Sequence, residues 1–98
     1  MIRKLLADRE CRVCGRPASH GHHLVYRSQG GDDYEGNIIP LCHVCHDKVH
    51  AGSTPVRRQI ILTLTADERA YVVSKFGDNA AGWAERVYGY PEGAWTND

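Results

Sequence analysis

The hydrophobic positions in the first half of the chain form two short runs that predict two strands. Residues 22–25 predict the first strand. Residues 38–41 predict the second, which its proline restricts to a sheet edge or a strand end. Residues 28–33 between them are rich in glycine and aspartate and predict a loop. Residues 43–51 predict a helix closed by Gly52. The order strand, loop, strand, helix predicts a small α+β fold.

Helical signals follow in the second half of the chain. An apolar stretch over residues 59–64 precedes a capping box that starts at Thr65, and this box predicts a helix to about Phe76. Asn79 can cap a further helix that contains Trp83. We expect these helices to form a hairpin that packs on the first half, and a helix-turn-helix is the alternative interpretation.

The length of the chain limits what its core alone can stabilise. A chain of 98 residues predicts a single domain over residues 1–98, and such a chain buries only a little over ~60% of its unfolded surface. A structural metal would compensate for so small a core. No apolar run is long enough to span a membrane, and residues 2–9 predict a short amphipathic helix instead of a signal peptide. We therefore expect a cytoplasmic protein.

The four cysteines form two C-x-x-C pairs, which are Cys11 with Cys14 and Cys42 with Cys45. In a reducing compartment, paired C-x-x-C motifs bind metal far more often than they form disulfides. Two such turns brought together supply the four soft ligands of a tetrahedral zinc site. The alternative is a thiol redox protein, which the second pair and the missing βαβ pattern disfavour.

The histidines predict a second, open metal site. His46 and His50 are four residues apart on the predicted helix, so both side chains can reach one ion. A third imidazole from His22 or His23 would leave positions open for water and substrate. Adjacent strand residues point to opposite faces, so the other histidine of this pair is free for proton transfer.

The charges are separated along the chain although the formal net charge is zero. Residues 1–31 are net basic and residues 51–64 add two arginines, whereas residues 32–50 and 65–98 are net acidic. A basic N-terminal segment could face a polyanion, and a solvated surface is the alternative.

The cysteines and histidines, together with Asn37, resemble the motif of the HNH endonucleases. The resemblance is carried by Gly21-His22-His23, by Asn37 and by Cys42-His-Val-Cys-His46-x-x-x-His50, and it covers about residues 9–52. It implies a ββα-metal, treble-clef-like finger with structural zinc as the catalytic core, and residues 56–98 are then a C-terminal extension of helices.

The resemblance also implies a role for each motif residue. His22, His46 and His50 would bind the catalytic ion, as in the three-histidine nucleases of the colicin type. His23 would activate water, and Asn37 would position that base or constrain the loop. Many members place aspartate or asparagine at some of these positions, so the ion is less defined. We expect structural Zn²⁺ and one catalytic Mn²⁺, Ni²⁺, Co²⁺, Zn²⁺ or Mg²⁺.

The function implied is the hydrolysis of DNA phosphodiester bonds, by nicking or by double-strand cleavage, with DNA as the partner and no membrane. Phage or mobile-element origin is common in the family. The alternative is a non-catalytic zinc-finger module that binds nucleic acid or protein, although it gives no reason for His23 and Asn37.

Several other residues carry weaker signals. Arg27 could contact the scissile phosphate or serve as a surface arginine. His20 and His43 fit no required position, and we expect them to face solvent or contact phosphate. The loop carboxylates Asp32, Asp33 and Glu35 could form a metal site, but in a glycine-rich loop we expect them to be solvated. The C-terminal aromatics Tyr88, Tyr90 and Trp95 could stack on bases, but we expect them to belong to the core or to caps.

Overall fold

The sheet is an antiparallel hairpin of two strands in a computed structural model that describes residues 9–96. Strand β1 spans His20–His23 and strand β2 spans Ile38–Leu41, with His20 opposite Leu41 and His23 opposite Ile38. The second strand has the predicted bounds. The first lies two residues earlier than predicted, because the ladder has ended by Leu24, where the backbone turns away from β2 while staying fully buried.

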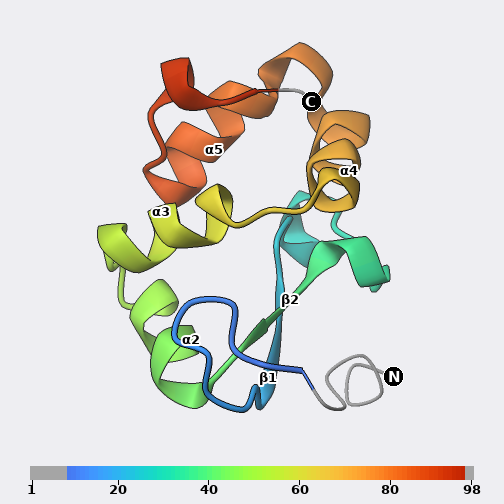
Figure 1. Cartoon of the computed structure of the whole chain (residues 1–98). Helices are drawn as coiled ribbons and strands as arrows, with labels where there is room; N and C mark the ends of the chain where they lie inside the picture. Colours follow the sequence, from blue (N-terminus) through green and yellow to red (C-terminus); the bar gives the residue numbers. More distant parts are fainter. Residues whose placement is uncertain (1–8, 97–98) are drawn as a thin grey trace.

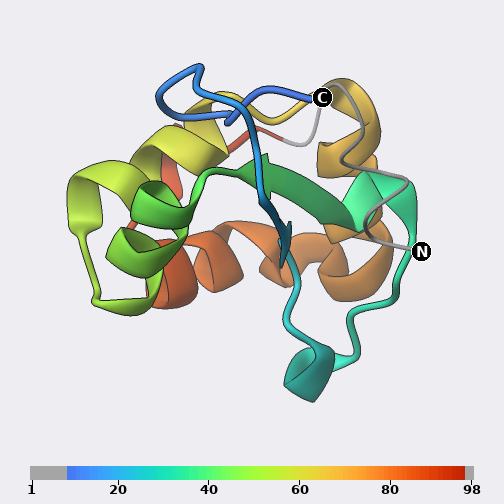
Figure 2. The same cartoon turned by 90° about the horizontal axis from the view of Figure 1, so that it is seen from below.

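The segment between the strands is irregular and is held at both ends. It contains two 3₁₀ turns, η1 (Arg27–Gln29) and η2 (Glu35–Asn37), and Figure 2 shows that the part around η1 projects away from the helices. The Leu24 N–H donates to the Asn37 carbonyl over 2.8 Å, which closes the base of the loop directly below the hairpin.

Helix α2 (His43–His50) follows β2 directly and begins at a cysteine. The Cys42 sulfur accepts a hydrogen bond from the Cys45 N–H, so Cys42 caps the first turn. Beyond the helix, Gly52 has a φ of +89°, which favours glycine, so the predicted helix and its glycine stop are confirmed. The order β1, β2, α2 gives the ββα unit, and the predicted small α+β fold is confirmed.

Three further helices follow in the described part of the chain. They are α3 (Thr54–Leu62), α4 (Ala66–Phe76) and α5 (Ala80–Tyr88), with the 3₁₀ turns η3 (Gly77–Asn79) and η4 (Glu92–Ala94). The capping box of α4 is confirmed, since both hydrogen bonds between Thr65 and Glu68 are present. Asn79 occupies the N-cap position of α5, but its side chain makes no capping hydrogen bond.

Helix α3 was not distinguished in the sequence, where residues 59–64 read only as an apolar stretch. The proline in its first turn is pre-organised for a helix, and Ile60 and Ile61 are buried while Leu62 is exposed. The predicted helix over residues 2–9 falls outside the described residues except for Arg9, which is not helical.

The C-terminal helices pack against one another and against the ββα unit. Figure 1 shows the hairpin and α2 at one end, α4 and α5 at the other, and α3 in contact with both α2 and α5. Buried hydrophobic residues continue from the hairpin through each of these helices; among them are Leu24, Ile39, Val49, Ile60, Val72 and Trp83. The C-terminal helices therefore share a core with the ββα unit.

One buried ion pair joins the first cysteine turn to the C-terminal helices. The Arg12 guanidinium binds both carboxylate oxygens of Glu68 over 2.8 and 2.9 Å and also donates to the Thr63 carbonyl. Glu68 is 5% exposed, so the pair is largely shielded from water. In the described part of the chain, every helix is too short or too polar to cross a membrane.

Candidate metal centre and active site

The four cysteines converge on one point. Their sulfur atoms all lie within 4.8 Å of one another, and the Cys14 and Cys42 sulfurs are 3.5 Å apart. The first turn closes through a 3.0 Å hydrogen bond from the Gly15 N–H to the Cys11 carbonyl. All four are free thiols. Two turns that present four sulfurs at this spacing fit a structural zinc site.

The electrostatics of the thiols match this fit. Burial opposes the ionisation of Cys11, but backbone hydrogen bonds from Cys42, Cys14 and Val13 outweigh it and lower the pKa of this thiol to about 6. Burial raises the pKa of Cys45 instead. The neighbouring sulfurs cannot all ionise without a cation between them, whereas a divalent soft ion would stabilise all four thiolates.

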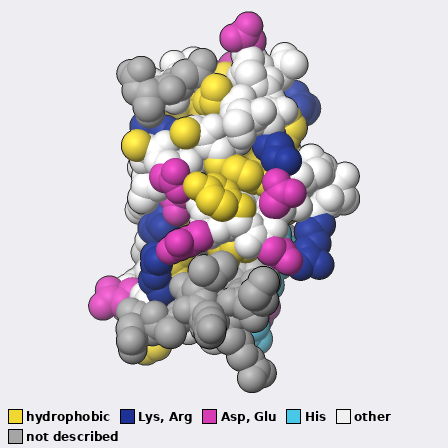
Figure 3. All heavy atoms as spheres, turned by 90° about the vertical axis from the view of Figure 1, so that its right-hand side faces the viewer, with side chains coloured by type: hydrophobic (Ala, Val, Ile, Leu, Met, Phe, Trp, Pro, Cys, Tyr) yellow, Lys and Arg dark blue, Asp and Glu magenta, His cyan; other side chains and the backbone are white. Residues whose placement is uncertain are grey.

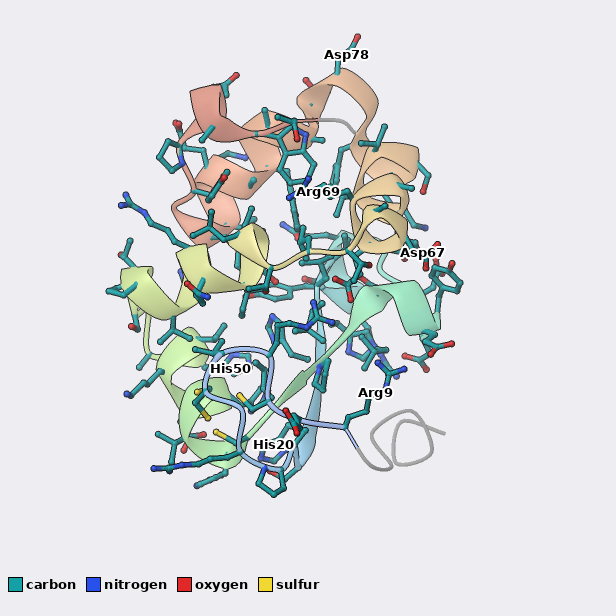
Figure 4. All side chains as sticks on the ribbon, viewed as in Figure 1. Arg9, His20, His50, Asp67, Arg69 and Asp78 are labelled. Carbon is teal, nitrogen blue, oxygen red and sulfur yellow. The ribbon has the colours of Figure 1, made fainter. Side chains whose placement is uncertain are left out.

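Three histidines from α2 and β1 form a second cluster, separate from the four thiols. His22 extends from β1, while His46 and His50 extend from successive turns of α2, and their ring nitrogens all lie within 4.8 Å of one another. The Nε2 atoms of His46 and His50 are 3.1 Å apart. Figure 4 shows His50 at the end of the molecule formed by the hairpin and α2, opposite Asp78. Three imidazoles are a donor set that fits a borderline divalent ion.

The His22 side chain is the buried member of this cluster. It is 3% exposed, and burial followed by the nearby His46 and His50 lowers its pKa to about 3. Burial also lowers the pKa of His46. Neutral imidazole is the form that binds metal, so both shifts favour the binding form. The cluster opens on a pocket of about 200 Å³; the residues that line it are Gly21, His22, His23, Tyr26, Arg27, His46 and His50.

His23 lines the same pocket but is held by a carboxylate. Its Nε2 lies 2.7 Å from the Asp33 Oδ1, and hydrogen bonds from His23 and Arg27 lower the pKa of Asp33. An ionised carboxylate only accepts, so His23 Nε2 carries a proton, and in the neutral ring Nδ1 then keeps its lone pair. Arg27 Nε approaches the same Nε2 at 3.5 Å, the outer limit of a hydrogen bond, so the contact with Asp33 decides the tautomer.

The contact between Asp33 and His23 could not be recognised from the sequence. The loop carboxylates are exposed, as expected, and Asp33 in addition accepts hydrogen bonds from His23 and, over 2.8 and 2.9 Å, from Arg27 Nη2. Asp32 accepts from Lys75 and the Tyr71 hydroxyl, and Glu35 pairs with Arg9. A double glycine, Gly30-Gly31, lies two residues before Asp33, and it signals that the chain can fold back toward the hairpin here.

Asn37 holds the loop and makes no hydrogen bond to His23. Its Oδ1 accepts from the Val25 N–H over 2.7 Å, and its Nδ2 donates to the Val25 and Asp32 carbonyls over 3.1 and 2.9 Å. It is fully buried. Of the two roles that the resemblance implies for Asn37, these contacts favour the constraint of the loop.

Tyr88 reaches the histidine cluster from the end of α5. Its hydroxyl lies 2.9 Å from His22 Nε2 and donates to the Leu24 carbonyl over 2.7 Å. Tyr88 was expected to be a core or cap residue. It is fully buried, and its hydroxyl is in addition a direct neighbour of the cluster. No sequence signal pointed to this contact.

The remaining predicted residues lie outside both metal-ligand groups. The rings of His20 and His46 are 4.6 Å apart, while His43 is exposed and pairs with Asp47. Tyr90 and Trp95 pack against the core. None of these residues joins either group within the described part of the chain.

Some charges that are separated along the sequence pair in the structure. Three basic side chains of the first segment bind acids from later segments, as in Arg9 with Glu35, Arg12 with Glu68 and Arg27 with Asp33. On the face shown in Figure 3, acidic and basic side chains alternate around exposed hydrophobic atoms. A continuous basic face is therefore not formed there.

Comparison with known proteins identifies the segment that carries both clusters. The family model described as HNH endonuclease matches residues 11–52. The chain is 38% identical over 55 residues to Anaredoxin of Nostoc sp. strain PCC 7120, a match that covers 54% of this chain and 72% of that protein. It is 37% identical over 43 residues to the uncharacterized protein YdfU of Escherichia coli K12, covering 41% of this chain and 12% of that protein. No solved structure matches it.

Proposed function

Because the chain belongs to the HNH endonuclease family, we propose that it is a metal-dependent endonuclease that hydrolyses phosphodiester bonds of DNA. The observation that carries this proposal is the convergence of three imidazoles beside His23 in one open pocket, apart from the four thiols. A structural zinc site alone would need only the thiols.

We assign the catalytic ion to His22, His46 and His50, and the structural zinc to the four cysteines. A divalent ion bound by the histidines would act as a Lewis acid that stabilises the negative charge developing on the phosphate and on the departing 3′ oxygen. Three protein ligands would leave positions for water and substrate, and Arg27 and His23 line the same pocket.

His23 would serve as the general base through Nδ1. This nitrogen takes a proton from water, the water oxygen bonds to phosphorus, and the bond from phosphorus to the 3′ oxygen breaks. The products are a 5′-phosphate and a 3′-hydroxyl, which takes its proton from solvent. Asp33 would act as a positioning residue, because its contact with Nε2 fixes the tautomer and supports the charge that His23 gains.

Arg27 would release its ion pair with Asp33 and bind the scissile phosphate instead. Its side chain is 66% exposed, and an exposed ion pair contributes little, so little is lost when the guanidinium turns toward a second anion. Guanidinium binds two phosphate oxygens at once, which suits a residue on the rim of the pocket.

The test is cleavage of supercoiled plasmid by the purified protein after mild chelation and addition of a single divalent ion. We expect nicked or linear DNA with the parent and a loss of about 10²–10⁴ in rate with His23→Ala, since that is the usual contribution of a general base. The control is Asp78→Ala, at the opposite end of the molecule in Figure 4, which should cleave like the parent.

The outcome against the proposal is equally defined. If the protein binds DNA in a mobility-shift assay but does not cleave it with any of the divalent ions added, it is a non-catalytic zinc-finger module. Cleavage by His23→Ala within a few-fold of the parent would place the general base elsewhere.

We also propose that residues 9–52 form the catalytic core and that residues 56–98 support it as an extension within a single domain over residues 1–98. The shared core and the buried pair between Arg12 and Glu68 support this division.

A further inference from the structure

The hydroxyl of Tyr88 lies between two buried groups of the first strand region. Tyr88 and Leu24 are fully buried, and His22 is 3% exposed. The hydroxyl oxygen is 2.9 Å from His22 Nε2 and 2.7 Å from the Leu24 carbonyl oxygen. Tyr26 is a further polar neighbour of this hydroxyl, and the two buried contacts are those that satisfy His22 Nε2 and the Leu24 carbonyl.

The number of protons decides which atom donates in each contact. A phenol carries one proton, and a carbonyl oxygen can only accept, so the short contact to Leu24 uses the Tyr88 proton. The contact with His22 then needs a proton on Nε2, because otherwise two lone pairs would face each other. The neutral His22 ring carries a single proton, which leaves Nδ1 without one.

We propose that Tyr88 is a positioning residue that holds His22 as the Nε2–H tautomer and thereby presents Nδ1 to the catalytic ion. The catalytic role of that ion rests on the proposed function. The tautomer itself rests only on the two contacts of the hydroxyl. A hydrogen bond to the far nitrogen of a ligating imidazole fixes both its tautomer and its ring direction, as is general for histidines that bind metal.

The rings around His22 restrict it further. Tyr26 meets the His22 ring edge to face at 5.7 Å and 87°, and Tyr88 meets it at 6.1 Å and 90°. Tyr88 is itself packed against Trp83 at 5.3 Å. Helix α5 thus supplies both the hydroxyl and the packing that holds it, so the C-terminal extension contributes directly to the geometry of the metal ligand.

The experiment compares the parent protein with Tyr88→Phe, which keeps the ring and removes only the hydroxyl. Tyr90→Phe is the matched control, because its hydroxyl contacts the Ala94 carbonyl and not the cluster. Long-range ¹H–¹⁵N spectra of the protein with zinc kept at the cysteines, but no ion at the histidines, report the tautomer of each imidazole. Titration calorimetry with Ni²⁺ then measures affinity at the histidines.

We expect the Nε2–H pattern for His22 in the parent and in Tyr90→Phe, and a mixture of tautomers in Tyr88→Phe. Affinity for Ni²⁺ should fall by about tenfold to 100-fold in Tyr88→Phe alone, the usual effect of losing such a partner. An Nδ1–H pattern for His22 in the parent would overturn the inference, even if the variant failed to fold. Unchanged tautomer and affinity in a folded Tyr88→Phe would overturn it as well.

These results are independent of nuclease activity. If the parent shows the expected tautomer and Tyr88→Phe loses Ni²⁺ affinity while neither cleaves DNA, the inference holds and the proposed function fails. If the parent cleaves DNA but His22 carries its proton on Nδ1, the proposed function holds and the inference fails.

Discussion

Replacement of Asn37 by alanine separates the two roles that the central asparagine could have. The side chain is fully buried and makes three hydrogen bonds to backbone atoms, two of them to Val25. None reaches His23. We therefore expect Asn37→Ala to act on the stability of the loop first, and on catalysis only through the loop.

The magnitude follows from the groups left without partners. Val25 is fully buried, so its N–H and carbonyl would both lose their hydrogen bonds without access to water. Each such group costs about 1–3 kcal/mol, which gives about 2–6 kcal/mol for the pair. The Asp32 carbonyl can turn to water and adds little. Small domains are stable by only about 5–15 kcal/mol, so a large part of the stability is at stake.

The assay is urea unfolding at a fixed zinc concentration, with hydrogen exchange at the Val25 amide as a local probe. Asn79→Ala is the matched control, since the Asn79 side chain makes no capping hydrogen bond, and we expect a change within about 0.5 kcal/mol. A loss below about 1 kcal/mol for Asn37→Ala, with the Val25 amide still protected, would refute the loop interpretation.

Four further outcomes are expected. Trp83→Ala should lower the free energy of unfolding by about 3–5 kcal/mol in the same urea assay, because Trp83 is fully buried against Phe76 and Tyr88. Weakened DNA binding in a variant of unchanged stability would instead assign Trp83 to the DNA interface. Mild chelation should leave about one zinc per chain by elemental analysis with the far-UV spectrum kept, since the thiol site is closed and the histidine site open. Cleavage should be faster with Mn²⁺ or Ni²⁺ than with Mg²⁺ at equal concentration, because Mg²⁺ prefers oxygen ligands, and the reverse order would remove His46 or His50 from the ligand set. Asp33→Asn should slow cleavage by less than the ~10²–10⁴ expected for His23→Ala, since the base remains and only its orientation is weakened. Equal losses in the two variants would make Asp33 more than a positioning residue.

The ββα unit could be predicted from sequence because its signals are local. The second strand and α2 depend on residues within a few positions of one another, and both formed with bounds within one residue of those predicted. Local signals also explain the capping box of α4. The first strand was displaced because Leu24 is apolar for burial in the core and not for pairing in the sheet.

The parts that could not be predicted depend on contacts between distant segments. The aliphatic pair Ile60 and Ile61 suits a strand as well as a helix, and only packing against α2 and α5 distinguishes the two. The contact between Tyr88 and His22 joins residues 66 positions apart. The ion-pair partners of the basic side chains could not be predicted for the same reason, because the partners of Arg9 and Arg12 lie 26 and 56 positions away.

The arrangement of the two clusters explains why one short chain would need both. Cys45 and His46 are neighbours in α2, so a zinc ion at the thiols would fix the start of the helix from which two of the three imidazoles extend. The third imidazole lies on β1, which the zinc would not hold directly. There, the hydroxyl of Tyr88 and the loop contacts of Asn37 supply the constraint. The two sides of the histidine cluster are thus held by independent means, and a loose ligand on either side would weaken a site whose geometry depends on all three.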